Sequence, residues 1–196
     1  MGKLLTVIGL CLVVLLLMAR FRSRDEVRNQ AQTYQDEVVP PGYSEVVKRS
    51  SDPKIVYLSD VRLDSQSQEI GKINKDLSFH GFSLCLDKVR YEKGLGVHAN
   101  SEIVYSLDSR YDYFESYIGL DDAEDDSSGS VVFTVFIDGQ KTYESPVMRW
   151  NSKTEHVKIQ IKDKQKLKLK VTDAGDGINT DQADWADAKL YLADSQ

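Results

Sequence analysis

The sequence predicts an all-β domain, an antiparallel β-sandwich of the jelly-roll type, with an N-terminal transmembrane helix in front of it. Nine short runs rich in Val, Ile, Tyr and Phe alternate with polar residues between positions 54 and 194, and clusters of turn residues separate them. Before them, residues 4–19 form an uncharged apolar run that is close to the length needed to cross a bilayer. These two patterns define the predicted architecture.

Three parts follow from these patterns along the 196-residue chain. Residues 1–24 predict a single-pass membrane anchor that is not cleaved, because arginines rather than a small-x-small cleavage site follow the apolar run. Residues 25–52 are polar and contain the breaker Pro40-Pro41-Gly42, which is typical of a tether. Residues 53–193 contain the strand pattern and predict the sandwich.

Individual segments of the sandwich can be predicted in more detail. In "VFIDGQKTYES" the pair Asp138-Gly139 supplies the two positive-φ positions of a tight hairpin turn. In "KIQIKDKQKLKLKV" the lysines alternate with aliphatic residues, so we expect the lysines on a solvent-exposed sheet face. A net charge of -6 excludes a general nucleic-acid binder, which needs a basic face.

The segment "YEKGLGVHANSEIVYSL", residues 91–107, is the first candidate for function. Gly94 and Gly96 predict a sharp turn, and His98 follows where the turn leads into a strand. No Gly-x-Ser-x-Gly elbow and no clustered metal ligands accompany this histidine, so the sequence predicts no enzymatic activity. We expect His98 to hold the turn, with ligand contact as the alternative.

The second candidate is the acidic segment "VTDAGDGINTDQADWADAKLYL", residues 171–192. Hard cations prefer several oxygen ligands from one loop, which predicts a structural calcium ion. The spacing is not that of an EF-hand, and Asp and Gly also simply build turns. The candidate ligands are Asp173, Asp176, Asp181 and Asp184. Trp185 is a candidate for stacking on a ligand or for filling the core.

Taken together, these segments resemble the NPCBM module, which is grouped with carbohydrate-binding module family 51. The resemblance covers residues 53–193 and is carried by "YLSDV", "KGLGVHA" (93–99), "YFESYIGLDD", "LKLKVTDAGDG" and "ADWADA" (183–188), in that order. It implies a galactose-binding-like β-sandwich that binds sugars, typically galactose-containing glycans, through loops at one end and has no catalysis of its own. His98, Asn100 and Trp185 then become the expected carbohydrate-binding residues.

Two departures from the family pattern bear on the ligand. Gln182 stands where relatives carry a histidine before the Ala-Asp-Trp motif, and Ile70 stands where they carry a tryptophan. The alternative function is therefore a structural or protein-interaction sandwich that has lost sugar binding. The family resemblance implies a domain outside the cytoplasm, whereas the arginines after the apolar run favour a domain inside the cytoplasm. We expect a non-catalytic, membrane-anchored, extracytoplasmic protein that binds galactosides.

Overall fold

The computed structural model describes residues 45–122 and 128–193. The predicted membrane anchor, residues 1–24, and most of the predicted tether lie outside these residues. Among the residues described, no helix is long and apolar enough to cross a membrane. The described residues belong to one compact unit that spans residues 42–196.

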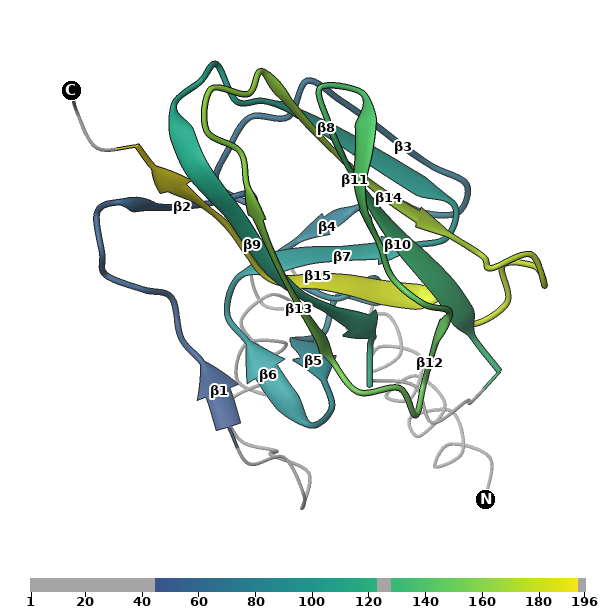
Figure 1. Ribbon diagram of the computed structural model, residues 1–196. Coiled ribbons are helices and arrows are strands. Elements are labelled where there is room, and N and C mark those ends of the chain that lie inside the picture. The colour runs from purple at the N-terminus through teal and green to yellow at the C-terminus, as the bar shows by residue number, and fades with distance from the viewer. Residues whose placement is uncertain (1–44, 123–127, 194–196) are drawn as a thin grey trace, which may run out of the picture. The chain divides into compact units, whose positions relative to one another are not determined.

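All regular elements of the described residues are strands (Figure 1). They are β1 (Glu45–Val47), β2 (Ile55–Tyr57), β3 (Ser65–Gln68), β4 (Asn74–Lys75), β5 (Leu84–Leu86), β6 (Val89–Tyr91), β7 (Gly94–His98), β8 (Ser101–Ser106), β9 (Tyr111–Leu120), β10 (Ser130–Ile137), β11 (Gln140–Glu144), β12 (Met148–Arg149), β13 (Glu155–Gln160), β14 (Lys166–Thr172) and β15 (Gln182–Leu192).

Two antiparallel sheets face each other. The first has the order β11-β10-β14-β8-β3, with β12 paired to β10, and the second has the order β13-β9-β15-β7-β4, with β2 paired to β15. We call them the β10 sheet and the β15 sheet. A small third sheet, β1-β6-β5, contributes the parallel pair β1–β6. The all-β sandwich predicted from the sequence is confirmed.

The core lies between the two large sheets. Alternate residues of each strand point inward, as the period-two pattern requires: in β14, Leu167, Leu169 and Val171 are buried, while the intervening lysines lie on the outer face. Trp185 of the β15 sheet packs edge-on against Phe133 of the β10 sheet, with ring centroids 4.9 Å apart. The lysine-bearing outer face was predicted correctly, and so was the β10–β11 hairpin at Asp138-Gly139.

The boundary of the domain differs from the prediction. Residues 45–47, which were assigned to the tether, form β1 and pair with β6. The backbone N–H of Ser50 donates to the hydroxyl of Tyr57 at 2.8 Å, and the Arg49 guanidinium lies 3.3 Å from Asp60. The polar composition of residues 45–52 predicted a tether. In the structure, polar contacts of this segment hold it against the domain.

Candidate functional site

The "KGLGVHAN" motif forms β7 and the short turn that leads into β8, at one end of the sandwich (Figure 1). The predicted turn at the two glycines is wrong, since both lie within β7. Their role is close approach. A Cβ on Gly96 would lie 2.3 Å from the carbonyl oxygen of Leu77, so only glycine lets the loop of residues 76–83 lie directly against the strand.

His98 is the last residue of β7 and is only 4% exposed. Its ring Nδ1 lies 2.7 Å from the carbonyl oxygen of Ala99, and its backbone N–H donates to Oε1 of Gln68 at 2.9 Å. The imidazole packs against Phe79, with centroids 4.8 Å apart, and Phe79 in turn packs edge-on against His80 at 5.0 Å. His98 is therefore the buried base of a row of three rings whose outer end, His80, is exposed.

Asn100 joins three loops at the same end. Its side-chain amide donates to Oε2 of Glu69 at 3.0 Å, and its Oδ1 accepts from the backbone N–H of Asp173 at 3.2 Å. The side chain is half-buried, so part of it stays accessible beside the bonds it already makes. Asn100 thus fixes the relative positions of the β3–β4, β7–β8 and β14–β15 connections.

Gln182 completes the arrangement. It begins β15 and lies directly opposite His98 in the strand pairing, and residues opposite each other in an antiparallel pair project from the same face. One rim of the sandwich therefore carries the row of rings and, beside it, the amides of Gln68, Asn100 and Gln182. We call this surface the His98 rim.

Trp185 does not belong to this surface. The residue is 1% exposed, and its ring packs between Phe133 and Phe114 in the core. A sugar needs an accessible ring face, so the prediction that Trp185 binds carbohydrate is wrong. The error arose because the acidic segment was assigned to a loop, whereas β15 begins at Gln182 and directs Trp185 inward.

The four aspartates predicted to bind calcium do not form one site. Asp181 accepts from the backbone N–H of Ser130 at 2.8 Å, and Asp176 accepts from the Ser130 hydroxyl at 2.7 Å. Burial, aided by the charges of Asp176 and Asp173, raises the pKa of Asp181 to about 6. No group of three or more His, Cys, Asp or Glu side chains within residues 45–122 and 128–193 is arranged to hold a metal ion.

Asp184 lies elsewhere, on the outer face of the β15 sheet beneath β5. The backbone N–H of Cys85 donates to Oδ2 of Asp184 at 3.3 Å and to Oδ2 of Asp121 at 3.1 Å. Complete burial, together with the Asp121 carboxyl, raises the pKa of Asp184. Its place in a calcium site was predicted wrongly, while calcium binding by the remainder of the loop stays a prediction.

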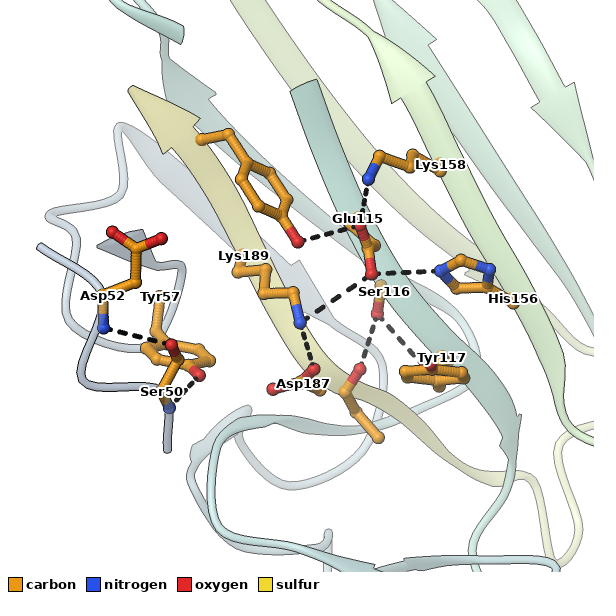
Figure 2. Close-up of polar contacts among 12 residues, drawn as sticks. Ser50, Asp52, Tyr57, Glu115, Ser116, Tyr117, His156, Lys158, Asp187 and Lys189 are labelled. Atoms are coloured by element: carbon orange, nitrogen blue, oxygen red, sulfur yellow. Dashed lines mark hydrogen bonds and ion pairs between the residues drawn. The ribbon is translucent and has the colours of Figure 1, made fainter. Parts of the chain in front are cut away.

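A second cluster of polar side chains lies on the outer face of β9, β13 and β15 (Figure 2). Glu115 is at its centre and is 7% exposed. Its carboxylate accepts from Lys158 at 2.8 Å and from the Tyr191 hydroxyl at 2.9 Å, and lies 3.1 Å from Nε2 of His156 and 3.8 Å from Nζ of Lys189. Because both carboxylate oxygens are already engaged by protein groups, this cluster is a structural network rather than a site.

Comparison with known proteins identifies the domain. The family model described as NPCBM/NEW2 domain matches residues 54–191. The chain belongs to this family. CBM51 from Clostridium perfringens GH95, solved in complex with methyl-galactose, is 42% identical; the match covers 69% of this chain and 99% of that one, with a TM-score of 0.66.

Other relatives place the NPCBM domain in larger proteins. CBM51-2 of Clostridium perfringens ZmpB, solved with GlcNAc, is 35% identical over 72% of this chain and 32% of that chain, with a TM-score of 0.68. A protein of Renibacterium salmoninarum named "Putative endo-alpha-N-acetylgalactosaminidase" is 34% identical over 147 residues. These residues are 71% of this chain but only 10% of that protein, so the present chain spans about a tenth of the curated relative's length.

Several residues of the candidate site were missed in the sequence. Phe79 and His80 were not singled out as site residues, although "SFHGF" places three aromatic side chains within five residues. Trp150 was not singled out either; it is 57% exposed next to Arg149, and Arg149 lies 3.8 Å from Asp176 of the β14–β15 connection. Aromatic residues next to turn residues were the sequence signal that could have pointed to both segments, residues 78–82 and the turn at Trp150.

Proposed function

We propose that this NPCBM domain binds a terminal neutral sugar of the galactose or N-acetylglucosamine type at the His98 rim, without catalysing a reaction on it. The observation that carries the proposal is the 42% identity to a module that was solved with methyl-galactose. The match covers 99% of that module. The GlcNAc complex of a second relative supports the same ligand class. Galactoside binding was the prediction from the sequence resemblance, and the proposal keeps it.

The chemistry of the rim suits such a ligand. A hexose has an apolar face of C–H groups and a periphery of hydroxyls, and sites for it combine a ring with a few oriented polar groups. In our proposal the sugar packs on Phe79 and His80, and its hydroxyls bind the amides of Gln182 and Asn100. His98 supports Phe79 from beneath and acts as a positioning residue. An open rim of this kind gives dissociation constants on the order of millimolar to micromolar.

Calorimetric titration tests the proposal. The protein is residues 42–196, which form a compact unit whose counterpart exists as an isolated module in the methyl-galactose complex. The titrants are methyl galactoside and N-acetylglucosamine. We expect saturable binding that weakens roughly tenfold in Phe79→Ala and in Gln182→Ala, because each removes about 1.4 kcal/mol of stacking or hydrogen bonding.

Matched controls separate the rim from general effects. Phe136→Ala removes a half-buried phenylalanine from the outer face of β10, and Asn151→Ala removes an exposed amide from the turn after β12. Neither should change the affinity. If the folded fragment releases no heat with either sugar, the proposal fails and the alternative function, a protein-interaction sandwich, takes its place. A loss of affinity in Trp150→Ala, with none in Phe79→Ala, would show that the sugar stacks on the exposed ring of Trp150 instead of on Phe79.

We also propose that residues 4–19 anchor the domain to a membrane with the domain outside the cytoplasm. The uncharged run supports the anchor, and the presence of glycans outside the cell supports the orientation. Fractionation of cells expressing the full chain, followed by protease treatment of intact cells, tests both parts. Recovery of the chain in the soluble fraction, or complete protection from the protease, would contradict them. Repeating the titration with calcium and with chelator tests the calcium prediction.

A further inference from the structure

A cavity lies at the end of the sandwich opposite the His98 rim, between the segment that leads into β3 and the β8–β9 turn. It has a volume of about 560 Å³, within the range of pockets that hold small ligands. Residues of these two segments line it: Val61, Arg62, Leu63, Asp64, Ser106, Asp108, Arg110 and Tyr111. Because β8 runs from the His98 rim to this cavity, the two surfaces are separated by the length of a strand.

Two of the residues that line the cavity are arginines, Arg62 and Arg110. Arg62 is exposed and has no ion-pair partner within the part of the chain that the structure describes. Arg110 has one partner, Asp108 at 3.4 Å, and both of these side chains are more than half exposed. An exposed pair of this kind contributes little, so a ligand can replace it without a large penalty.

Acceptors lie beside these donors. Asp64 accepts from the Ser106 hydroxyl through Oδ2 at 2.7 Å, which leaves its second oxygen for a ligand. The Asp108 carboxylate supplies further acceptor positions at the mouth of the β8–β9 turn. A sugar hydroxyl donates readily to a carboxylate, so this side of the cavity suits a polyol rather than a simple anion.

The cavity wall is held by the fold. The backbone N–H of Asp64 donates to Val104 O of β8 at 2.8 Å, and that of Arg110 donates to Leu107 O at 3.0 Å. The Arg110 guanidinium lies over the buried ring of Tyr111, 5.3 Å from its centroid, which limits the positions it can take. The Arg110 guanidinium and the Asp64 carboxylate are therefore restricted in position before a ligand arrives.

We infer that this cavity is a second glycan site, for a sugar that carries a carboxylate, such as a uronic or sialic acid. The ligand carboxylate binds the planar forks of Arg62 and Arg110, and the ligand hydroxyls donate to Asp64 and Asp108. A phosphate or sulfate would meet the two aspartates without donors to offer them. A neutral sugar would leave the arginines without an anion. This inference is independent of the His98 rim.

Amide chemical shifts of residues 42–196, titrated separately with galacturonate and N-acetylneuraminate, test the inference. We expect shifts for Asp64, Ser106 and Asp108 with at least one of the acids. Arg62→Ala and Arg110→Ala should each weaken this binding roughly tenfold or more, since each removes a charge-assisted, two-pronged contact. Arg62→Lys, which keeps the charge but not the fork, should weaken it less.

The controls identify the site. Lys162→Ala removes a positive charge from the exposed turn after β13, outside the cavity lining, and should leave the affinity for the acids unchanged. Gln182→Ala should do the same, because it lies at the other end, and this separates the inference from the proposed function. The inference is overturned if galactose binds here as tightly as galacturonate, if neither acid moves these amides, or if binding survives both arginine variants.

Discussion

Replacing Glu115 by glutamine should destabilise the domain in a way that depends strongly on pH. Burial by itself would raise the pKa of this carboxyl, but hydrogen bonds from Lys158, Tyr191 and His156, together with the charge of Lys189, lower it from 4.5 to about 2. Glu115→Gln keeps the shape and the contact with the Tyr191 hydroxyl but removes the charge that the two lysines neutralise (Figure 2).

The shift in pKa sets the size of the effect. At about 1.4 kcal/mol for each pH unit, ionised Glu115 contributes at most ~3.4 kcal/mol to the free energy of unfolding at pH 7. Lys158 and His156 are both 47% exposed, so solvent screens part of their interaction with Glu115. We therefore expect Glu115→Gln to lower the free energy of unfolding by ~1.5–3 kcal/mol at pH 7.

The sign of the pH dependence follows from the lowered pKa. The contribution of Glu115 is complete above its unfolded pKa of 4.5 and is lost as the pH falls toward 2. Urea unfolding of residues 42–196 at pH 7, 5, 4 and 3 should show the gap between wild type and variant shrinking by roughly a quarter at pH 4 and by more than half at pH 3. A gap that is absent at pH 7, or constant down to pH 3, would refute this account of the cluster. Glu144→Gln is the matched control and should change little, because Glu144 and its partner Lys141 are both about half exposed, at 47% and 53%.

Three further variants test other parts of the structure. Asp184→Asn should be more stable than wild type at pH 8 but nearly equal at pH 4, because the raised pKa of Asp184 makes wild-type stability fall as the pH rises from 3.8 toward that pKa. Equal urea midpoints at pH 8 would contradict this. Gly96→Ala should cost ~1–3 kcal/mol in urea unfolding and weaken sugar binding, since its Cβ meets the backbone of Leu77 at 2.3 Å and displaces the loop that carries Phe79; unchanged stability would rule out the close approach. Gln182→His, which introduces the histidine expected here from the family resemblance, should change the ratio of the affinities for methyl galactoside and N-acetylglucosamine. An unchanged ratio in calorimetry would place Gln182 outside the site.

The sandwich could be predicted because each of its strands carries a local signal. Alternation in "KLKLKV" assigned one face of β14 to solvent and the other to the core, and Asp138-Gly139 marked the β10–β11 hairpin by its conformational requirement alone. Both signals involve only residues that are close together in the sequence, so they can be read without knowing the fold. The same holds for the short turn segments that separate the strands.

The site could be predicted only in part, because it depends on what the fold brings together. Trp185 follows a glycine-rich acidic stretch, yet its pairing within the β15 sheet directs it into the core. Gly94 and Gly96 indicated a turn, but both allow close approach instead: Gly96 lies against the loop that carries Leu77, and Gly94 lies against the backbone of β15. Phe79 gained a role only through its contact with His98, nineteen positions along the chain, and no local pattern reveals such a contact.

The central claim is that the His98 rim binds a neutral sugar, and calorimetric titration of residues 42–196 with methyl galactoside, in parallel for wild type and Phe79→Ala, tests it most directly. The account predicts saturable binding in the wild type and an affinity roughly tenfold lower in the variant, with both proteins unfolding cooperatively. Equal affinity in the two proteins would contradict the assignment of the site, and no binding to the folded wild type, with N-acetylglucosamine equally silent, would contradict the proposed function itself.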